Sequence, residues 1–416
     1  MGLEGTTSAR AYAEALRNTD ATGAVQRDRH AALLGTPLLV VGVALAAINL
    51  RPAVTSMAAV LGEVRADLGA SVLWASLLTA VPTLCFGLAA VAAPAVGRRF
   101  GMARAVGLSM AVLTVGLLLR VLDGSWVVLG GTLVATAGIA IGNVLIPVVV
   151  KESFPGQVGR VTGIYTAALA AGGGIGAALT PPLEQLFGGW RAAVAAWAVL
   201  SLAALLLWGR AARHEPAAAT VSGAPPAGRS LLRSPLAWAV TGFFGLQALF
   251  AYVTMGWLAE LLVSEGITRT TAGLMLAAIN LIGIPISLIV PRIALARRSQ
   301  SGWITGMGSI GLLGVIGLIL APTAAPWFWA LLLGIGMGVF PLGLGVIALR
   351  TRTAADTASL SAMAQGIGYL LASVGPFLFG VLHGATGSWT ISLWLLVGVL
   401  VLELVLGWII GRPRYV

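Results

Sequence analysis

The sequence is poor in charged residues. Only 9% of its 416 residues are Asp, Glu, Lys or Arg, whereas 58% are hydrophobic and the mean hydropathy is +0.96. A soluble domain carries about a quarter charged residues, and so few charges cannot form a water-exposed surface of ordinary size. This composition argues against a soluble enzyme. It predicts that hydrocarbon surrounds most of the protein, which requires spans of about 20 apolar residues.

Cysteine and histidine are scarce as well. Cys85 is the single cysteine, which excludes an intramolecular disulfide and a cysteine-based metal site. His30, His214 and His383 are scattered, and no HExxH motif or zinc spacing is present. The glycine-rich stretch Gly172–Gly176 lies within an apolar run, so we interpret it as part of a membrane helix and not as a nucleotide-binding loop. We expect no catalytic site, no metal and no cofactor.

Acidic residues are outnumbered by basic ones, which gives a net charge of +11 and a pI of about 11.2. In a soluble protein this excess would suggest binding to nucleic acid. Here the basic residues lie at the ends of apolar runs, and no basic stretch is interleaved with aromatic residues for base stacking. We therefore expect these cations to face an anionic lipid leaflet, and we expect no nucleic acid partner.

Twelve apolar runs alternate with short polar breaks along the chain. Six precede and six follow a linker of small residues and prolines at 211–232. The predicted spans are 36–62, 72–97, 103–123, 125–150, 158–187, 189–210, 233–262, 270–295, 301–321, 324–350, 356–383 and 387–411. The sequence thus predicts an all-α membrane protein of twelve transmembrane helices. Its two pseudo-symmetric six-helix bundles occupy 36–210 and 233–411, with tails at 1–35 and 412–416.

The positions of the basic residues test this count. With the N-terminus inside, 20 of the 25 Lys and Arg residues fall on the cytoplasmic side. The exceptions are Arg51, within a span, and four residues on the outer side: Arg65, Arg120, Arg191 and Arg269. A missed helix would exchange the sides of all later segments and destroy this asymmetry. We therefore predict a multi-pass protein of the cell inner (cytoplasmic) membrane with both termini and the linker cytoplasmic.

The two halves contain similar strings at equivalent positions. Gly138–Gly142 in the fourth span corresponds to Gly334–Gly338 in the tenth, and Gly188-Gly189-Trp190 corresponds to Gly387-Ser388-Trp389. Such a correspondence indicates a parallel duplication. In transporters with internal repeats, the substrate site lies near the membrane midplane between the two repeats.

Several motifs are distributed over the chain beyond residue 36. They are Asn49-Leu50-Arg51-Pro52, Gly142-Asn143-Val144-Leu145-Ile146-Pro147 with Lys151, Thr162-Gly163-Ile164-Tyr165, Phe340-Pro341-Leu342, and Gln365-Gly366-Ile367-Gly368-Tyr369 with Gly375-Pro376. With these motifs the sequence resembles the major facilitator superfamily, and within it the branch of cyanate permeases and nitroimidazole transporters. The resemblance implies alternating access by rocking of two bundles. It also implies a central cavity lined by helices 1, 4, 5, 7, 8 and 11.

Arg51 is the strongest candidate for a binding residue. It lies about 15 residues into the first span, too deep to reach either membrane surface easily. A guanidinium at that depth costs from ~2.5 to more than 10 kcal/mol, so it must face a cavity or a partner. Its planar set of donors suits a carboxylate-like or linear anion. The alternative is a structural ion pair with Glu403, the single acid near the middle of a span.

Other polar and aromatic residues at membrane depth are weaker candidates for the same site. Each of them has helix packing as an equally good interpretation when taken alone. Their shared feature is a position on a helix that the resemblance places at the cavity. The candidates are Asn49, Asn143, Tyr165, Gln247, Tyr252, Trp257, Asn280, Gln365 and Tyr369.

Two functions remain open from the sequence, and both have the bilayer as surroundings and a small molecule as substrate. The first is a transporter of a small, cyanate-like anion, in which case we expect a monomer with Arg51 in its cavity. The second is a proton-coupled exporter of small drugs such as nitroimidazoles, which needs a titratable carboxylate; Glu403 and Glu260 are the candidates. A non-transporting receptor is disfavoured, because the sequence shows no appended sensory or catalytic domain.

Overall fold

The structure confirms the predicted architecture. This computed structural model describes residues 36–154, 156–211 and 231–416. Within those ranges it contains twelve helical spans long and apolar enough to cross a membrane, and no β-strand. The predicted tail at 1–35 and nearly all of the predicted linker lie outside the described residues.

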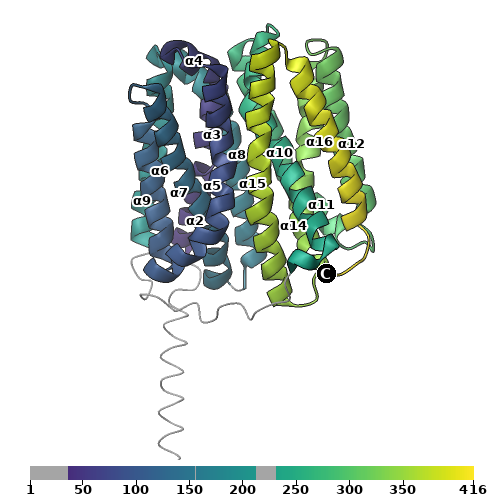
Figure 1. The fold of residues 1–416 in the computed structure, drawn as a ribbon. Coiled ribbons are helices and arrows are strands. Elements are labelled where there is room, and N and C mark those ends of the chain that lie inside the picture. The colour runs from purple at the N-terminus through teal and green to yellow at the C-terminus, as the bar shows by residue number, and fades with distance from the viewer. Residues whose placement is uncertain (1–35, 155, 212–230) are drawn as a thin grey trace, which may run out of the picture.

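The first half of the chain provides six of the spans. Figure 1 shows them on the left, with α4 lying across one end of the bundle. The helices are α2 (Pro37–Asn49), α3 (Pro52–Ala59), α4 (Leu61–Leu68), α5 (Val72–Phe100), α6 (Met102–Leu119), α7 (Ser125–Ser153), α8 (Val158–Phe187) and α9 (Trp190–Ala211). Helices α2 and α3 together form the first span.

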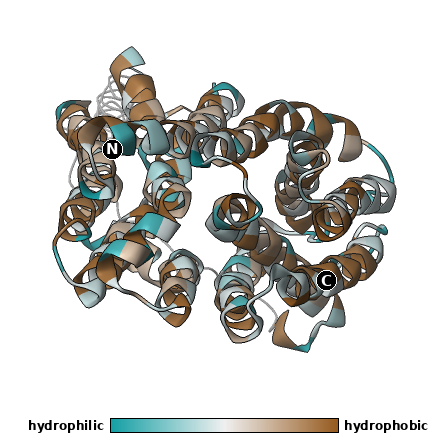
Figure 2. Cartoon of the chain, turned by 90° about the horizontal axis from the view of Figure 1, so that it is seen from above, coloured by the Kyte–Doolittle hydropathy of each residue, from teal (hydrophilic) through white to brown (hydrophobic). Residues whose placement is uncertain are grey.

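The second half provides the other six spans. Its elements are the short 3-10 helix η1 (Leu231–Arg233), α10 (Pro235–Ser264), α11 (Arg269–Ala294), α12 (Ser301–Leu320), α13 (Pro326–Met337), α14 (Val339–Leu349), α15 (Ala354–Thr386) and α16 (Trp389–Ile410). Helices α13 and α14 together form the tenth span. The view along the helices in Figure 2 shows the two groups side by side.

The outside of the molecule is apolar. Val91, Val199 and Leu320 expose 80%, 71% and 76% of their surface, and they lie on helices of both halves. Large apolar side chains distributed over the helix surfaces in this way indicate a hydrocarbon environment, since a soluble protein rarely exposes extended apolar patches.

The first span is broken in its middle, at Leu50 and Arg51. Helix α2 ends at Asn49 and α3 begins at Pro52. Proline has no backbone N–H, so the carbonyl of Ile48, four residues earlier, has no helical partner. The break places Arg51 between two helix ends, where it is the N-cap of α3 and its carbonyl accepts the first hydrogen bonds of that helix.

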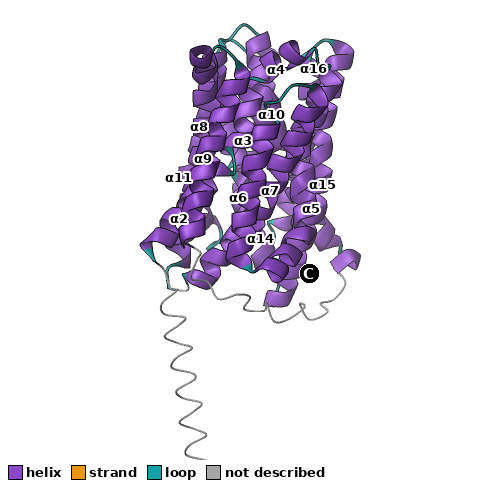
Figure 3. Cartoon of the chain, turned by 90° about the vertical axis from the view of Figure 1, so that its left-hand side faces the viewer, coloured by secondary structure: helices purple, strands orange, loops and turns teal. Residues whose placement is uncertain are grey.

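Two helix pairs form most of the interface between the halves, α5 with α15 and α8 with α11. Figure 3 shows the two pairs on opposite sides of the molecule. Glycine permits the close approach in both pairs. A β-carbon added at Gly87 of α5 would lie 2.7 Å from Cγ of Leu370, and one added at Gly273 of α11 would lie 2.5 Å from the carbonyl oxygen of Ala177.

We call the end of the molecule that carries α4 the α4 side; it lies opposite the C-terminus (Figure 1) and is the predicted outer side. Of the four basic residues predicted there, three form ion pairs. Arg191 pairs with Asp67 of α4 and, at 3.1 Å, with Asp123. The hydrogen bond from Trp190 and the pairing with Arg191 hold the pKa of the exposed Asp67 carboxyl below its ordinary value.

Arg120, predicted as part of an outer segment, is completely buried. Its guanidinium donates to the carbonyl of Ala53 and, at 3.1 Å, to Oγ of Ser56, so it fixes α3 to the end of α6. Its charge is therefore directed at the protein interior. None of the four basic residues on the α4 side is a free surface cation, which reconciles them with the positive-inside pattern.

Cysteine labelling provides a test of the predicted orientation. Ser222, in the predicted linker and outside the described residues, and Glu265, which is exposed on the α4 side, are replaced singly by cysteine in a Cys85→Ala background. Because the basic excess predicts a cytoplasmic linker, we expect an impermeant maleimide added to intact cells to label Glu265→Cys but not Ser222→Cys. Opening the cells is the control, and it should make Ser222→Cys reactive. Labelling of both positions from outside would contradict the twelve-span topology.

Candidate functional site

Arg51 connects the two halves of the molecule. Its Nη1 donates to Oδ1 of Asn280 on α11 at 3.2 Å and contacts Sδ of Met255 on α10 at 3.6 Å. The guanidinium has no other hydrogen-bond or ion-pair partner in the described part of the chain. Because Nε and Nη2 each carry donors, Arg51 keeps several donors available for a ligand.

The glycines of α8 bring that helix against the break in the first span. A β-carbon at Gly172 would lie 2.1 Å from the carbonyl oxygen of Ile48, and one at Gly176 would lie 2.8 Å from Cα of Pro52. This is the small-residue spacing that allows membrane helices to approach closely. The glycine-rich stretch lies in a helical span, as predicted, and it packs that helix against the first span.

A polar pair lies next to Arg51 on the first half. Tyr165 of α8 donates its hydroxyl to Oδ1 of Asn143 on α7 at 3.1 Å. Arg51 is close enough to Tyr165 to interact with it electrostatically. Since Asn143 uses its oxygen in this bond, its amide nitrogen still offers two donors.

Aromatic side chains from both halves meet beside these polar groups. Phe86 of α5 lies 5.6 Å from Tyr252 of α10 and 5.5 Å from Tyr369 of α15, measured between ring centres. Phe244 lies 5.2 Å from Tyr369, with its ring edge-on. Both tyrosines interact electrostatically with Arg51. A ligand at Arg51 therefore has an aromatic wall within reach.

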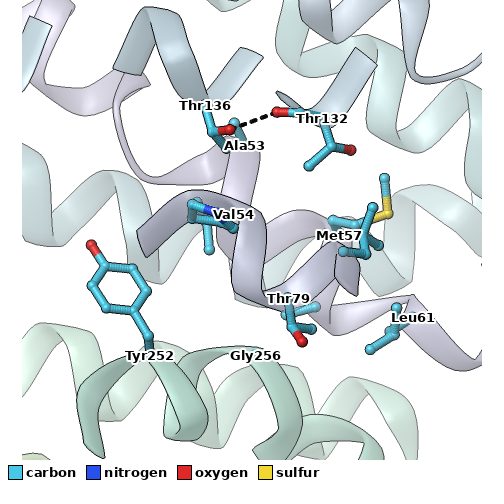
Figure 4. Close-up of a pocket in the computed structure, with 12 residues that line it drawn as sticks. Ala53, Val54, Met57, Leu61, Thr79, Thr132, Thr136, Tyr252 and Gly256 are labelled. Atoms are coloured by element: carbon cyan, nitrogen blue, oxygen red, sulfur yellow. Dashed lines mark hydrogen bonds between the residues drawn. The ribbon is translucent and has the colours of Figure 1, made fainter. Parts of the chain in front are cut away.

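A pocket continues from Tyr252 toward the α4 side (Figure 4). Helices α3, α4, α5 and α7 of the first half and α10 of the second line it, so it lies between the halves. Its lining combines apolar side chains with three threonines: Ala53, Val54, Met57, Ala58, Leu61, Leu78, Thr79, Pro82, Thr132, Thr136, Tyr252 and Gly256. The hydroxyls of Thr132 and Thr136 donate to backbone carbonyls one turn earlier in their own helix. The lining is thus apolar with few free polar groups, which suits an uncharged part of a ligand.

Six of the ten residues predicted for the binding site lie together around this interface. They are Arg51, Asn143, Tyr165, Tyr252, Asn280 and Tyr369. They come from the first, fourth, fifth, seventh, eighth and eleventh spans. Each of the six helices that the resemblance places at the cavity contributes one residue.

The other four predicted residues serve packing within one half. The buried amide of Asn49 donates to the carbonyls of Leu45 and, on α9, Leu200, at 2.7 and 3.3 Å. Trp257 is fully buried and donates to the carbonyl of Pro376 at 2.9 Å. Both residues lie in helical spans, and their hydrogen bonds stay within one half of the molecule.

Gln247 and Gln365 likewise form their hydrogen bonds within one half, the second. The amide nitrogen of Gln247 lies 3.5 Å from the carbonyls of Gly336 and Met337, inside the second half. Gln365 donates to Ser361 one turn earlier in α15, at 2.7 Å. Among the described residues, neither side chain forms a hydrogen bond with Arg51.

The alternative prediction that Glu403 neutralises Arg51 is wrong. Glu403 is buried in α16, with 2% of its surface exposed, and it forms none of the ion pairs found in the described residues. Helix α16 packs against α10, α12 and α15, all in the second half. Glu403 therefore lies within one bundle and not between the two, where a coupling residue would be exposed alternately to each side.

Sequence reasoning missed several groups at the site. Met255 and Phe86 are apolar residues in apolar helices, so no pattern distinguishes them from lipid-facing neighbours. Gly173 faces the pair of Arg51 and Asn280: a β-carbon there would lie 2.8 Å from Oδ1 of Asn280 and 3.2 Å from Cδ of Arg51. The glycine-rich stretch was the available signal for this close contact.

Two reciprocal ion pairs join the halves on the α4 side. Arg65 of α4 pairs with Glu260 of α10, and Glu63 of α4 pairs with Arg269 of α11. Each half therefore contributes one acid and one base. The acids are shielded, with 13% of each side chain exposed. These pairs must separate before the halves can part on this side.

Comparison with known proteins identifies the family. Residues 38–373 match the model of the Major Facilitator Superfamily. The chain is 35% identical to the 2-nitroimidazole transporter of Escherichia coli (strain K12), covering 91% of this chain and 96% of that protein. It is 30% identical to the cyanate transport protein CynX of the same strain, covering 86% and 94%.

The fold agrees with this relationship. A bacterial homologue of the human lysosomal transporter Spinster, solved in an inward-facing and occupied conformation, superposes with a TM-score of 0.73. The two chains share 14% sequence identity, and the match covers 91% of this chain and 98% of the other. The family model, the similar sequences and the twelve-helix fold all lead to one conclusion: this chain belongs to the Major Facilitator Superfamily, in the branch that includes the cyanate and 2-nitroimidazole transporters.

Proposed function

We propose that this chain is a secondary active transporter that moves a small anionic, cyanate-like solute across the cytoplasmic membrane by alternating access, with Arg51 as the anion-binding residue. The proposal rests on the location of the Arg51 guanidinium and on the partners that it contacts. It lies between the two halves, bonded to a neutral amide oxygen and a sulfur, and no described acid neutralises it.

The electrostatics of this position favour an anion. In a low-dielectric interior, one uncompensated charge outweighs the dipoles around it. The guanidinium adds geometric selectivity, because its planar donors match two oxygens of a carboxylate or nitrite, or the end of a linear anion. The amide of Asn143 and the hydroxyls of Tyr252 and Tyr369 supply neutral donors for the remaining atoms of the solute.

The distribution of the site over both halves fits alternating access. Arg51, Asn143 and Tyr165 belong to the first half, whereas Tyr252, Asn280 and Tyr369 belong to the second. A solute between them contacts both bundles when they close and becomes accessible when they rock apart. We propose that the protein works as a monomer, with its termini in the cytoplasm.

A second candidate is the export of small heteroaromatic drugs. Two observations favour it: the rings of Phe86, Tyr252 and Tyr369 beside Arg51, and the 35% identity to a 2-nitroimidazole transporter. Proton coupling would need an acid at the interface. Glu260, paired with Arg65 between the halves, occupies such a position, whereas Glu403 does not.

Ligand-dependent stabilisation distinguishes the two candidates. We expect sodium cyanate, sodium nitrite or sodium benzoate to raise the apparent melting temperature of the purified protein. A ligand at 100 times its Kd adds about 2.7 kcal/mol of stability. Sodium chloride at equal ionic strength is the control. Stabilisation by 2-nitroimidazole alone, with no response to the anions, would contradict the anion proposal and support the drug exporter.

A further inference from the structure

The contact between Arg51 and Asn280 suggests how the site is held before a solute arrives. We propose that Asn280 is a positioning residue that occupies Arg51 in the absence of solute, and that an anion binds by displacing it. The inference rests on the proposed function, because it takes Arg51 as the anion-binding residue. It concerns how that site is controlled, and it assigns Asn280 a role as competitor of the solute and not as its ligand.

The orientation of the Asn280 amide is fixed by the protein. Its Nδ2 donates to the carbonyl of Leu276, one turn earlier in α11, at 2.8 Å. With the nitrogen committed to that bond, Oδ1 is directed toward Nη1 of Arg51, 3.2 Å away. The side chain is buried, with 4% of its surface exposed. Asn280 therefore presents an acceptor to the same nitrogen of Arg51 that an anion would use.

This acceptor is also too close to Arg51 to share it with a solute at the same nitrogen. Both side chains pack against Gly173, where a β-carbon would lie within 3.2 Å of each of them. An amide oxygen and an anion are both acceptors, so they compete for Nη1. A solute that accepts hydrogen bonds from both Nη1 and Nη2 of the guanidinium must therefore displace Asn280 from Nη1.

The exchange favours charged solutes. Both acceptors bond to a charged guanidinium, but the amide of Asn280 is neutral. Only an anion adds the attraction between opposite charges, which is strong in a low-dielectric interior. Met255, the other contact of Nη1, offers only a weak thioether acceptor. An anion can thus replace both, whereas a neutral solute gains little over the resident amide. Asn280 thereby makes the site selective for anions over neutral solutes.

Displacement also alters the connection between the halves. Arg51 belongs to the first half and Asn280 to the second, so their bond is a direct link across the interface near the middle of the membrane. An anion on Arg51 removes that link and replaces it with its own contacts. Occupation of the site therefore changes the attachment of α3 to α11, which is the kind of differential contact that a conformational change requires.

The first test uses protein without ligand. Asn280→Asp places a carboxylate where the anion would bind. A double-mutant cycle of Asn280→Asp with Arg51→Gln measures the interaction between the two positions by thermal or chemical unfolding. We expect the aspartate to be markedly better tolerated beside the native Arg51 than in the Arg51→Gln background. Equal effects of Asn280→Asp in both backgrounds would overturn the inference, because Asn280 would then not control Arg51.

The second test measures the affinity for cyanate and for benzoate on folded, monodisperse protein. Removing the competing acceptor in Asn280→Ala should raise the affinity about tenfold or more, because the lost hydrogen bond has a charged donor. In Asn280→Asp the affinity should fall about tenfold or more, because the internal carboxylate holds Arg51. A loss of affinity in Asn280→Ala would overturn the inference and make Asn280 a direct ligand.

The same measurements separate this inference from the proposed function. If neither anion loses affinity in Arg51→Ala, the proposed function fails, while the cycle still reports whether Asn280 and Arg51 interact. If Arg51→Ala removes binding but neither Asn280 variant changes it, the proposed function stands and the inference fails.

Discussion

Replacing Arg51 by alanine is expected to abolish transport of the solute while the protein remains folded. The reason is the free energy required to place a charged side chain within the membrane. A guanidinium in the middle of a membrane span is strongly unfavourable, by ~2.5 kcal/mol or more, and in this structure no ion pair among the described residues offsets that cost. Its removal relieves a desolvation cost and breaks one hydrogen bond to Asn280. Function should therefore suffer far more than stability.

The conservative substitution sharpens this prediction. Arg51→Lys keeps the positive charge but replaces the planar donors by a compact ammonium. We expect it to retain weak binding of a monovalent anion, because the charge supplies part of the affinity and the geometry supplies the rest. Uptake into proteoliposomes and binding to purified protein should both follow the order of wild type, Lys variant and Ala variant.

A surface arginine provides the matched control. Arg160 of α8 is exposed and forms no ion pair in the described part of the chain. Arg160→Ala changes the net charge by the same amount, so it should leave anion binding unaltered. Undiminished anion affinity in Arg51→Ala would refute the anion proposal and favour the drug exporter. Aggregation of Arg51→Ala alone would assign Arg51 a structural role.

The helices were predictable because the bilayer imposes one requirement on every span. Each span needs about 20 apolar residues, and basic residues gather on one side. Departures from regularity were harder to predict. The break at Arg51 follows from Pro52, which is visible in the sequence. The break at Gly338 has a similar signal, because Pro341 lies four residues beyond Met337 and leaves that carbonyl without its helical partner, but the sequence alone does not say that the helix divides there.

Site residues could be predicted where a polar side chain in an apolar helix is energetically unfavourable without a partner. They could not be predicted where membership of the site depends only on the direction in which the side chain points. Arg51, Asn143 and Asn280 are polar groups in apolar helices, and each needs a partner there. Gln247 and Trp257 satisfy the same criterion, yet they point into the second half. Helices with polar groups on more than one face do not reveal which face meets the other bundle. That information comes from the packing of whole helices.

The ion pairs of the α4 side could not be predicted from the sequence either. Glu63, Arg65, Glu260 and Arg269 lie near span ends, where charged residues are ordinary. Their reciprocal pairing across the interface depends on where α4 lies over the bundle (Figure 1). A charged residue at a span end has water as an alternative partner, so the sequence contains no energetic reason to expect a specific pair.

The close packing of α8 on the broken first span leads to a second prediction with a large effect. Gly172→Ala should destabilise the protein by about 1–3 kcal/mol or more, the cost of overpacking a tight interior. The added methyl would lie 2.1 Å from the carbonyl oxygen of Ile48, a backbone atom that cannot rotate away. Either α8 or α2 must move, and the movement shifts Arg51, three residues beyond Ile48.

The matched control is Gly283→Ala on α11, where an added β-carbon meets no atom within 4 Å. Alanine is a better helix former than glycine by ~1 kcal/mol, so this variant should be as stable as wild type or slightly more stable. Thermal unfolding in detergent and anion binding are compared for both variants. We expect Gly172→Ala to lose both stability and affinity, since the carbonyl freed by Pro52 and the guanidinium of Arg51 belong to the same short break. If the two variants behave alike, α8 does not constrain this break, and the position of Arg51 depends on its contacts with Asn280 and Met255 alone.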